Sequence, residues 1–217
     1  FSYADGERGI YGISLTLRCG ERVAIAGHSG SGKSTIASLL QRLYEPTSGY
    51  ITVDGHALST MSSAHLRAHM AVVGQTPALF PASVSENIRC GMSDAHIPQD
   101  AVVTAAQRAH AHQFIEALPS GYDTAVGGTT SHLSGGQAQR IAVARALARP
   151  ARILVLDEFT SSLDRNTADA MIEAVLGVHD DKSVRVVVLE EGTVVEQGTF
   201  DDLVACGGAL SRVLQGV

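Results

Sequence analysis

The sequence RVAIAGHSGSGKSTIASLL, residues 22–40, predicts a strand, a glycine-rich loop and a helix in that order. The run RVAIAG is short and apolar and ends at a glycine, which is typical of a buried parallel strand. The apolar face of the helix would consist of Ile36, Leu39, Leu40 and Leu43, which recur at helical spacing. A glycine-rich loop between a strand and a helix is the setting in which such loops bind phosphate.

The loop satisfies the Walker A pattern of a nucleotide-binding site. In this pattern the backbone N–H groups converge on phosphate oxygens, and the following helix adds the positive end of its dipole. We expect Lys33 to reach the β and γ phosphates and the Ser34 hydroxyl to ligate Mg²⁺. The alternative, a flexible Gly/Ser linker, does not account for the flanking strand and helix. The loop residues expected to bind the nucleotide are Gly27, Ser29, Gly30, Ser31, Gly32, Lys33, Ser34 and Thr35.

The composition favours one globular α/β domain. The chain has 217 residues, enough for a sizeable core, and 16 basic against 22 acidic residues argue against a nucleic-acid-binding surface. Its three cysteines lie far apart without metal-type spacing, which favours reduced thiols in a cytosolic compartment. No apolar run approaches the roughly 20 residues that cross a bilayer, and the opening FSY indicates a domain cut from a longer polypeptide.

The rest of the chain predicts a mixed α/β organisation. Turn residues and short alternating or apolar runs indicate strands, whereas four prolines between residues 76 and 131 separate helix-like segments. We interpret residues 76–131 as a helical insertion between two parts of an α/β core. The other expected elements are a β-ribbon at 45–55, strands at 70–75 and 152–158, a helix at 137–148 and a hairpin at 185–198 that turns at Glu191–Gly192.

Two carboxylates end the apolar strand at 152–158. At the end of a parallel strand, Asp157 would lie beside the phosphate loop and hold Mg²⁺ directly or through water. Glu158 follows it and could orient the water that attacks the γ-phosphate. An exposed acidic strand end is the alternative interpretation, and the Walker A loop in the same chain disfavours it.

The pentapeptide LSGGQ, residues 133–137, resembles the signature motif of the ATP-binding cassette (ABC) family. Ser134 and the two glycines after it would form an anion-binding helix N-terminus, in addition to the Walker A loop. In ABC proteins two cassettes pack head to tail, and each signature helix caps the γ-phosphate that the partner's Walker A loop binds. The resemblance thus implies that four residues act on the partner's ATP: Ser134, Gly135, Gly136 and Gln137.

The resemblance to ABC cassettes extends over nearly the whole chain. Tyr3 matches the aromatic residue that stacks on adenine, with core packing as the alternative role of a lone tyrosine. Gln75 matches the Q-loop glutamine that contacts Mg²⁺, and SSLD at 161–164 matches the D-loop. The implied fold is a P-loop NTPase core with a mainly parallel sheet, an antiparallel β subdomain and an inserted α-helical subdomain. The implied catalytic residues are Glu158, Lys33 and Gln75, and the implied Mg²⁺ ligands are Ser34, Gln75 and Asp157.

The segments NIRCGM and FIEALPSGYDTAVGG are similar to those of the exporter branch of the family. In that branch the cassette is fused to a transmembrane domain that moves peptides, lipids or drugs outward. The implied partners are therefore a second nucleotide-binding domain, identical or homologous, and a transmembrane domain, with no nucleic acid. The implied location is the cytoplasmic face of a membrane. The expected domain is 1–217, with 1–75 and 132–217 as the core and 76–131 as the helical insertion.

The sequence departs from the family where a switch histidine is expected. That histidine follows an additional strand, whereas here His179 lies close behind the expected helix, and the stretch from Gly177 to Val184 has room only for a turn. Either a segment is missing from the sequence or this cassette lacks a core strand. A segment missing from the sequence is the physically simpler explanation, because a fold without an inner strand would leave buried backbone groups unpaired. In addition, Gly128 stands where exporters usually have a glutamate.

Three functions follow as hypotheses of different kinds. The leading one is a cassette that binds and hydrolyses MgATP to drive export, which the presence of Glu158 favours. The second is a degenerate cassette that binds ATP as a regulatory clamp with little hydrolysis, which the absent switch histidine favours. The third is an ABC ATPase of the DNA-repair or chromosome type, which the acidic charge and the lack of sustained heptads disfavour.

Overall fold

The computed structural model describes residues 1–3, 9–91, 97–127, 133–176 and 184–216. The chain divides into two compact units, each of which has its own packing. The first unit comprises Phe1–Met61 and Asp180–Val217, and the second comprises Ser62–His179. The division into a core and an insertion at 76–131 remains a prediction.

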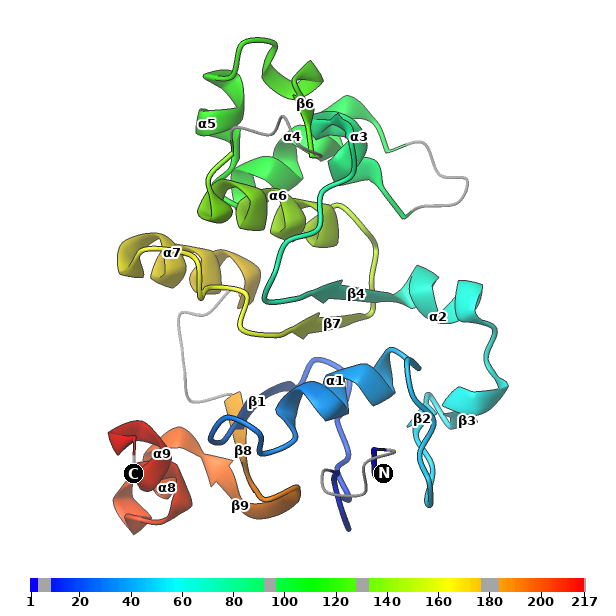
Figure 1. Cartoon of the computed structure of the whole chain (residues 1–217), viewed down its shortest axis with the longest axis vertical. Coiled ribbons are helices and arrows are strands. Elements are labelled where there is room, and N and C mark those ends of the chain that lie inside the picture. Colours follow the sequence, from blue (N-terminus) through cyan, green and yellow to red (C-terminus); the bar gives the residue numbers. More distant parts are fainter. Residues whose placement is uncertain (4–8, 92–96, 128–132, 177–183, 217) are drawn as a thin grey trace. The chain divides into compact units, whose positions relative to one another are not determined.

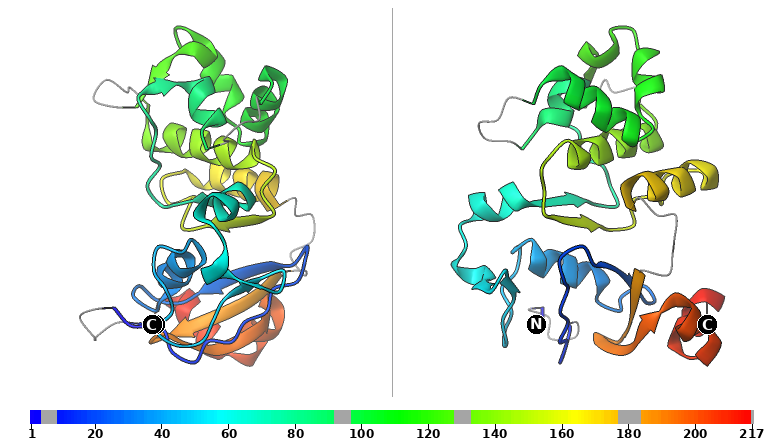
Figure 2. Two further views of the ribbon diagram at one scale, coloured as in Figure 1. Left: turned by 90° about the vertical axis from the view of Figure 1, so that its right-hand side faces the viewer. Right: turned by 180° about the vertical axis from the view of Figure 1, so that it is seen from behind.

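The first unit is built on a three-stranded sheet in the order β1-β8-β9 (Figure 1). β1 (Arg22–Ala26) pairs in parallel with β8 (Val184–Glu190), which pairs antiparallel with β9 (Thr193–Thr199). The hairpin at 185–198 with its turn at Glu191–Gly192 is thereby confirmed, as is the parallel pairing of the strand before the Walker A loop. Figure 2 shows this unit from two further sides. Its other elements are α1 (Lys33–Leu40), the antiparallel ribbon β2 (Thr52–Val53) and β3 (His56–Ala57), η1 (Leu58–Thr60), α8 (Phe200–Cys206) and α9 (Ala209–Gln215).

The helix after the Walker A loop is shorter than the sequence predicts. α1 ends at Leu40, and Leu43, expected on its buried face, is 64% exposed. The backbone adopts a left-handed conformation at Arg42, with φ of 57°, which stops the helical repeat. The apolar spacing therefore predicts the apolar face of the helix correctly up to Leu40 but wrongly includes Leu43.

The second unit contains a two-stranded parallel sheet and most of the helices. β4 (Met70–Val73) pairs in parallel with β7 (Ile153–Leu156), so both strands expected here are confirmed. The expected helical character of the segment after residue 76 is confirmed as well, with a short antiparallel ribbon added. The further elements are α2 (Ser63–His69), β5 (Ala82–Ser83), α3 (Val84–Arg89), α4 (Gln99–Arg108), α5 (His112–Glu116), η2 (Gly121–Asp123), β6 (Ala125–Val126), α6 (Gly135–Leu147) and α7 (Arg165–Leu176).

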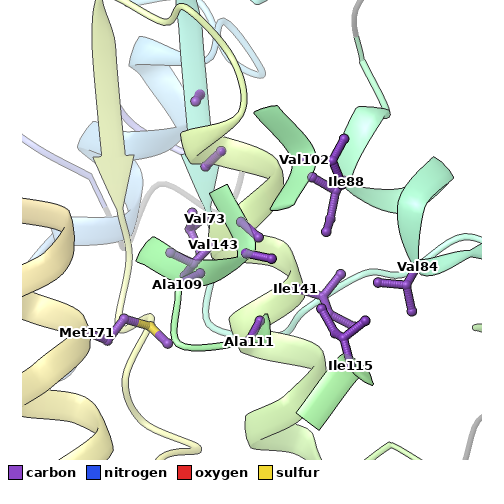
Figure 3. Packing of buried hydrophobic residues seen from close by; sticks show 14 of the residues in the cluster. Val73, Val84, Ile88, Val102, Ala109, Ala111, Ile115, Ile141, Val143 and Met171 are labelled. Carbon is purple, nitrogen blue, oxygen red and sulfur yellow. The ribbon is translucent and has the colours of Figure 1, made fainter. Parts of the chain in front are cut away.

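The largest apolar core lies in the second unit and centres on α6 (Figure 3). Ile141 and Val143 on α6 are buried together with Ile88 on α3 and Val102 on α4. Helices α3 and α4 both pack on α6, and β4 contacts the same helix. The N-terminus of α6 therefore belongs to a helix that packs on α3, α4 and β4.

Replacing Ile141 by alanine tests this core. We expect the free energy of unfolding to fall by about 2–5 kcal/mol, because a fully buried side chain is removed from packed surroundings. Chemical denaturation of both proteins measures the difference. Leu214→Ala is the control, because that side chain is 58% exposed and its loss should change stability by less than about 0.5 kcal/mol.

The parallel strands are less buried than the sequence predicts. Among the described strands, β1 is hydrogen-bonded only to β8, and β7 only to β4. Each therefore has an edge without a described neighbour. Accordingly, Ala24 on β1 is exposed, and Leu154 on β7 is 38% exposed. Of the expected mainly parallel sheet, the structure describes one parallel strand pair in each unit, β1 with β8 and β4 with β7.

The helices in the described part of the chain are all too short or too polar to cross a membrane. Cys19, Cys90 and Cys206 are free thiols, two of them exposed.

Candidate nucleotide-binding site

The Walker A loop is folded around the ammonium group of Lys33. Lys33 Nζ donates hydrogen bonds to the carbonyl oxygens of Gly27 (2.8 Å) and His28 (2.9 Å), so the side chain curls back over the loop. The loop also needs its glycines. A Cβ on Gly27 would lie 2.4 Å from the Leu189 carbonyl oxygen, and Gly32, at φ of 105°, would place one 2.6 Å from Ile10. The loop conformation therefore excludes side chains at both positions.

The hydroxyl-bearing residues of the loop differ in their exposure. Ser31 and Thr35 are buried, whereas Ser29 and Ser34 are exposed. The Ser34 hydroxyl, expected to ligate Mg²⁺, is thus open to solvent at the start of α1. Gly30 is exposed as well and has a positive φ of 82°.

Tyr3 lies next to this helix in the first unit. Its hydroxyl is 3.1 Å from Thr35 Oγ1, which connects the tyrosine with the first turn of α1. The structure therefore brings Tyr3, Lys33, Ser34 and Thr35 together, as expected for one nucleotide site. The contact with Thr35 was not predicted from the sequence.

In the second unit the structure brings Gln75 and Glu158 together. Gln75 follows β4 and Glu158 follows β7, and the Gln75 side-chain amide donates a 2.8 Å hydrogen bond to Glu158 Oε2. The parallel pairing of β4 and β7 brings the carboxyl ends of both strands to one edge of the sheet. There the Asp157 amide donates a 2.9 Å hydrogen bond to the Val73 carbonyl oxygen. Glu158 also has a positive φ of 45°. Such a conformation is strained for a residue with a Cβ, and strained residues cluster at functional sites.

The signature motif forms the N-terminus of α6. Ser134 is exposed, its hydroxyl accepts a hydrogen bond from the Gln137 amide (3.2 Å), and Gln137 Oε1 accepts one from the Ser134 amide (2.9 Å). This arrangement is a capping box, which fixes the first turn. A Cβ on Gly136 would lie 3.2 Å from the Ser162 carbonyl oxygen, so the D-loop packs directly on the signature glycine.

The D-loop ends at Asp164, which caps the start of α7 and lies near the charge of Arg140 on the signature helix. The Asp164 carboxylate accepts a 3.0 Å hydrogen bond from the Thr167 amide at the start of α7. Bonds from the Thr167 side chain and amide, with a smaller effect of the nearby Arg140 charge, lower the pKa of Asp164. Arg140 in turn donates to the His110 carbonyl oxygen (2.8 Å) and lies over the Phe114 ring. Signature helix, D-loop and α5 are therefore connected within one unit.

Gln139 is a residue that sequence analysis missed. It lies on α6 with no exposed surface, and its amide donates a 3.0 Å hydrogen bond to the carbonyl oxygen of Gly74, next to Gln75. Its Oε1 has no hydrogen-bond partner among the described residues. A glutamine in a helix with two arginines and four alanines gives no sign of burial, so no sequence signal distinguishes it from a surface glutamine.

Some predicted features lie outside the described residues. These are the segment 177–183, which contains His179 and the expected position of the missing strand, and Gly128 in the exporter-type segment. The remaining candidates fall into two groups according to unit. Tyr3 and the Walker A residues belong to the first unit, and Gln75, Asp157, Glu158 and the signature residues belong to the second.

Comparison with known proteins identifies the class to which this fold belongs. The family model described as "ABC transporter" matches residues 10–161, which include the Walker A loop, the signature motif and Glu158. The chain therefore belongs to the ABC transporter family. The P-loop NTPase fold of an ABC nucleotide-binding domain, expected from the sequence, is confirmed.

Its similar relatives include an ABC transporter, an export protein and an ATP-binding subunit of a channel. ABC transporter B family member 28 of Arabidopsis thaliana is 41% identical over 94% of this chain and 30% of its own length. The β-(1→2)glucan export ATP-binding/permease protein NdvA of Agrobacterium fabrum is 41% identical over 99% of this chain and 39% of its own. The mitochondrial potassium channel ATP-binding subunit of Rattus norvegicus is 40% identical over 99% of this chain and 32% of its own length. The chain thus spans about a third of the length of these proteins.

A solved structure gives the same assignment. A bacterial Atm1-family ABC exporter with ATP bound superposes with a TM-score of 0.86 at 35% identity, covering 95% of this chain and 38% of the exporter chain. The expected exporter branch is therefore confirmed. The rat alignment spans 232 residues, more than the 217 of this chain, so the relative contains residues without a counterpart here.

Proposed function

We propose that this chain binds MgATP, pairs head to tail with a second nucleotide-binding domain around the nucleotide, and hydrolyses ATP to drive export. The observation that carries the proposal is the Gln75–Glu158 hydrogen bond of 2.8 Å, made by a glutamate in a strained conformation. Both side chains are exposed and lie outside the buried apolar cluster of the unit, whereas a water-activating carboxylate needs a fixed position.

The first unit would bind the nucleotide itself. The exposed Ser34 hydroxyl and the loop N–H groups are suited to Mg²⁺ and phosphate oxygens, and Lys33 would exchange its two carbonyl contacts for the β and γ phosphates. Tyr3 would stack on the adenine ring. The oxygens of Ser34, Gln75 and Asp157 are of the type that Mg²⁺ prefers, and the ion would neutralise charge on the phosphates.

The second unit would supply the catalytic and partner-binding groups. Glu158 would accept a proton from the attacking water, and Gln75, bonded to it, would help to place that water. Ser134, Gly135, Gly136 and Gln137 would face the γ-phosphate bound by the partner. The exposed Ser134 and the capped first turn of α6 support this role, because a rigid helix N-terminus binds anions without reorganising.

The transporter context rests on the relatives. NdvA is by its name an export ATP-binding and permease protein, and the similar solved structure is an exporter. By analogy, we expect a transmembrane domain as the second partner and a position at the cytoplasmic face of a membrane. ATP bound between the Walker A loop of one cassette and the signature helix of the other would be the link that closes the two cassettes.

A second candidate function is a regulatory clamp that binds ATP and hydrolyses it slowly. It is favoured by the sequence between Leu176 and Val184, which has no room for the additional strand and switch histidine of the family. Loss of an acid–base or positioning group lowers turnover by about 10²–10⁴. Binding and dimer closure would persist in this case, so turnover distinguishes the two functions.

Sedimentation of the purified chain tests the pairing. We expect a monomer without nucleotide and a dimer with MgATP in a Glu158→Gln chain, where hydrolysis cannot release the pair. Ser134→Arg should prevent the dimer, because a bulky side chain at the helix N-terminus would occupy the place of the partner's nucleotide. A monomer under all conditions would contradict the proposal, and a dimer that forms equally without nucleotide would remove ATP as its cause.

A further inference from the structure

Three aromatic side chains of the first unit form one cluster. The Tyr3 ring lies 4.9 Å from that of Phe1 and 5.3 Å from that of Tyr44, with interplanar angles of 82° in both pairs. Phe1 and Tyr44 contact each other at 5.3 Å. These are edge-to-face distances at which aromatic pairs attract each other. Tyr3 is therefore held by two rings, one of which comes from a distant part of the sequence.

The position of Tyr44 is set by the end of α1. α1 ends at Leu40, and the left-handed backbone at Arg42, two residues before Tyr44, redirects the chain. An ion pair of 2.8 Å between Arg42 and Glu45 spans the residues on either side of this turn. The same features that shorten α1 therefore fix the backbone that carries Tyr44.

Tyr44 contributes little to the core of the unit. Its side chain is 45% exposed and belongs to neither cluster of buried residues. Its described ring contacts are those with Phe1 and Tyr3. A role in stability alone would not require a large exposed aromatic residue at this place.

We propose that Tyr44 is a positioning residue for the nucleotide base: it orients the Tyr3 ring for stacking and so contributes to the preference for a purine nucleotide over a bare polyphosphate. The inference rests on the proposed binding of ATP by the first unit. Tyr3 is held at its hydroxyl by Thr35, at 3.1 Å, and at its ring by Tyr44. A ring fixed at both places loses less conformational entropy when a base stacks on it.

The test compares ATP with inorganic tripolyphosphate, which has the phosphates but no base. Calorimetric titration of the chain with each ligand in the presence of Mg²⁺ gives two dissociation constants. We expect Tyr44→Leu to weaken ATP binding by about 2- to 10-fold, the range of one aromatic pair, and to leave tripolyphosphate binding unchanged. Tyr44→Phe keeps the ring and should bind both ligands as the unmodified chain does.

Two further variants separate positioning from general damage. Tyr50→Leu removes a tyrosine that is 84% exposed and should change neither constant. In a Tyr3→Leu background, Tyr44→Leu should have no further effect on ATP, because it acts through Tyr3. An unchanged ratio of the two constants in Tyr44→Leu, or additive effects with Tyr3→Leu, would overturn the inference. Failure of the unmodified chain to bind either ligand would instead refute the proposed nucleotide binding.

Discussion

Glu158→Gln should lower the ATP turnover of this chain by about 10²–10⁴-fold, because the amide cannot accept the proton of the attacking water. ATP binding should persist, since the residues expected to hold the phosphates belong to the Walker A loop. The amide is nearly isosteric with the carboxylate, so the hydrogen bond from Gln75 has a replacement acceptor at the same position. Steady-state phosphate release under saturating MgATP measures the effect.

Glu116→Gln is the matched control for this substitution. Glu116 is on α5 in the same unit, and its side chain is 62% exposed, so its loss should leave turnover unchanged. Equal, near-zero rates in the unmodified chain and in Glu158→Gln would eliminate the active ATPase and leave the regulatory clamp. Similar but substantial rates would show that another group activates the water.

Lys33→Met should weaken the binding of ATP by roughly 10- to 100-fold. The ammonium group would contribute charge-assisted hydrogen bonds to the β and γ phosphates, each worth about 1.5–3 kcal/mol. Methionine retains most of the length of the side chain, so the loop fills a similar volume. Equilibrium titration with a fluorescent ATP analogue measures the dissociation constant.

Arg18→Met is the control for a loss of positive charge in the same unit, because Arg18 is exposed and lies outside the loop. Its affinity for the analogue should match that of the unmodified chain. The loop in Lys33→Met loses two contacts to Gly27 and His28, so thermal unfolding without nucleotide must accompany the titration. Unchanged affinity in a folded Lys33→Met chain would refute the role of Lys33.

Local sequence patterns predict the elements that carry the phosphate chemistry. The strand, loop and helix around Lys33 and the strand before Asp157 are where apolar runs and glycines place them. These elements are specified by residues close together in the chain. The Gln75–Glu158 pair is less local, and the family resemblance, which assigned roles to both residues, did not predict their hydrogen bond.

The features that sequence analysis missed depend on contacts between distant segments. Gln139 is buried because β4 ends beside α6, and Tyr44 reaches Tyr3 because α1 stops at Leu40. Neither of these two contacts produces a periodic pattern in the sequence. The spacing of Leu43 even predicts a longer helix. The periodicity of apolar residues contains no information about the single left-handed residue at Arg42, just past the end of the helix.

The departure from the family between Gly177 and Val184 bears on stability and on the rate of hydrolysis. Among the described strands β1 and β7 each have one hydrogen-bonded neighbour, and apolar residues such as Leu154 are partly exposed as a result. Backbone groups at such edges are paired with water or with another strand. We expect a chain extended by a strand and a histidine between Gly177 and Val184 to unfold at a higher temperature, because the added strand would pair backbone groups. It should also turn ATP over faster, because it would supply the switch histidine that the family resemblance implies.

In the proposed dimer, ATP lies between the Walker A loop of one copy and the signature helix of another. Mixing a Ser29→Cys chain with a Ser134→Cys chain tests this arrangement most directly, with Cys19, Cys90 and Cys206 replaced by serine and Glu158→Gln present in both. Both introduced thiols would be exposed. With MgATP and a short bis-maleimide, we predict crosslinked dimers in the mixture and none in either chain alone. Absence of the mixed dimer, or its equal formation without nucleotide, would contradict the claim.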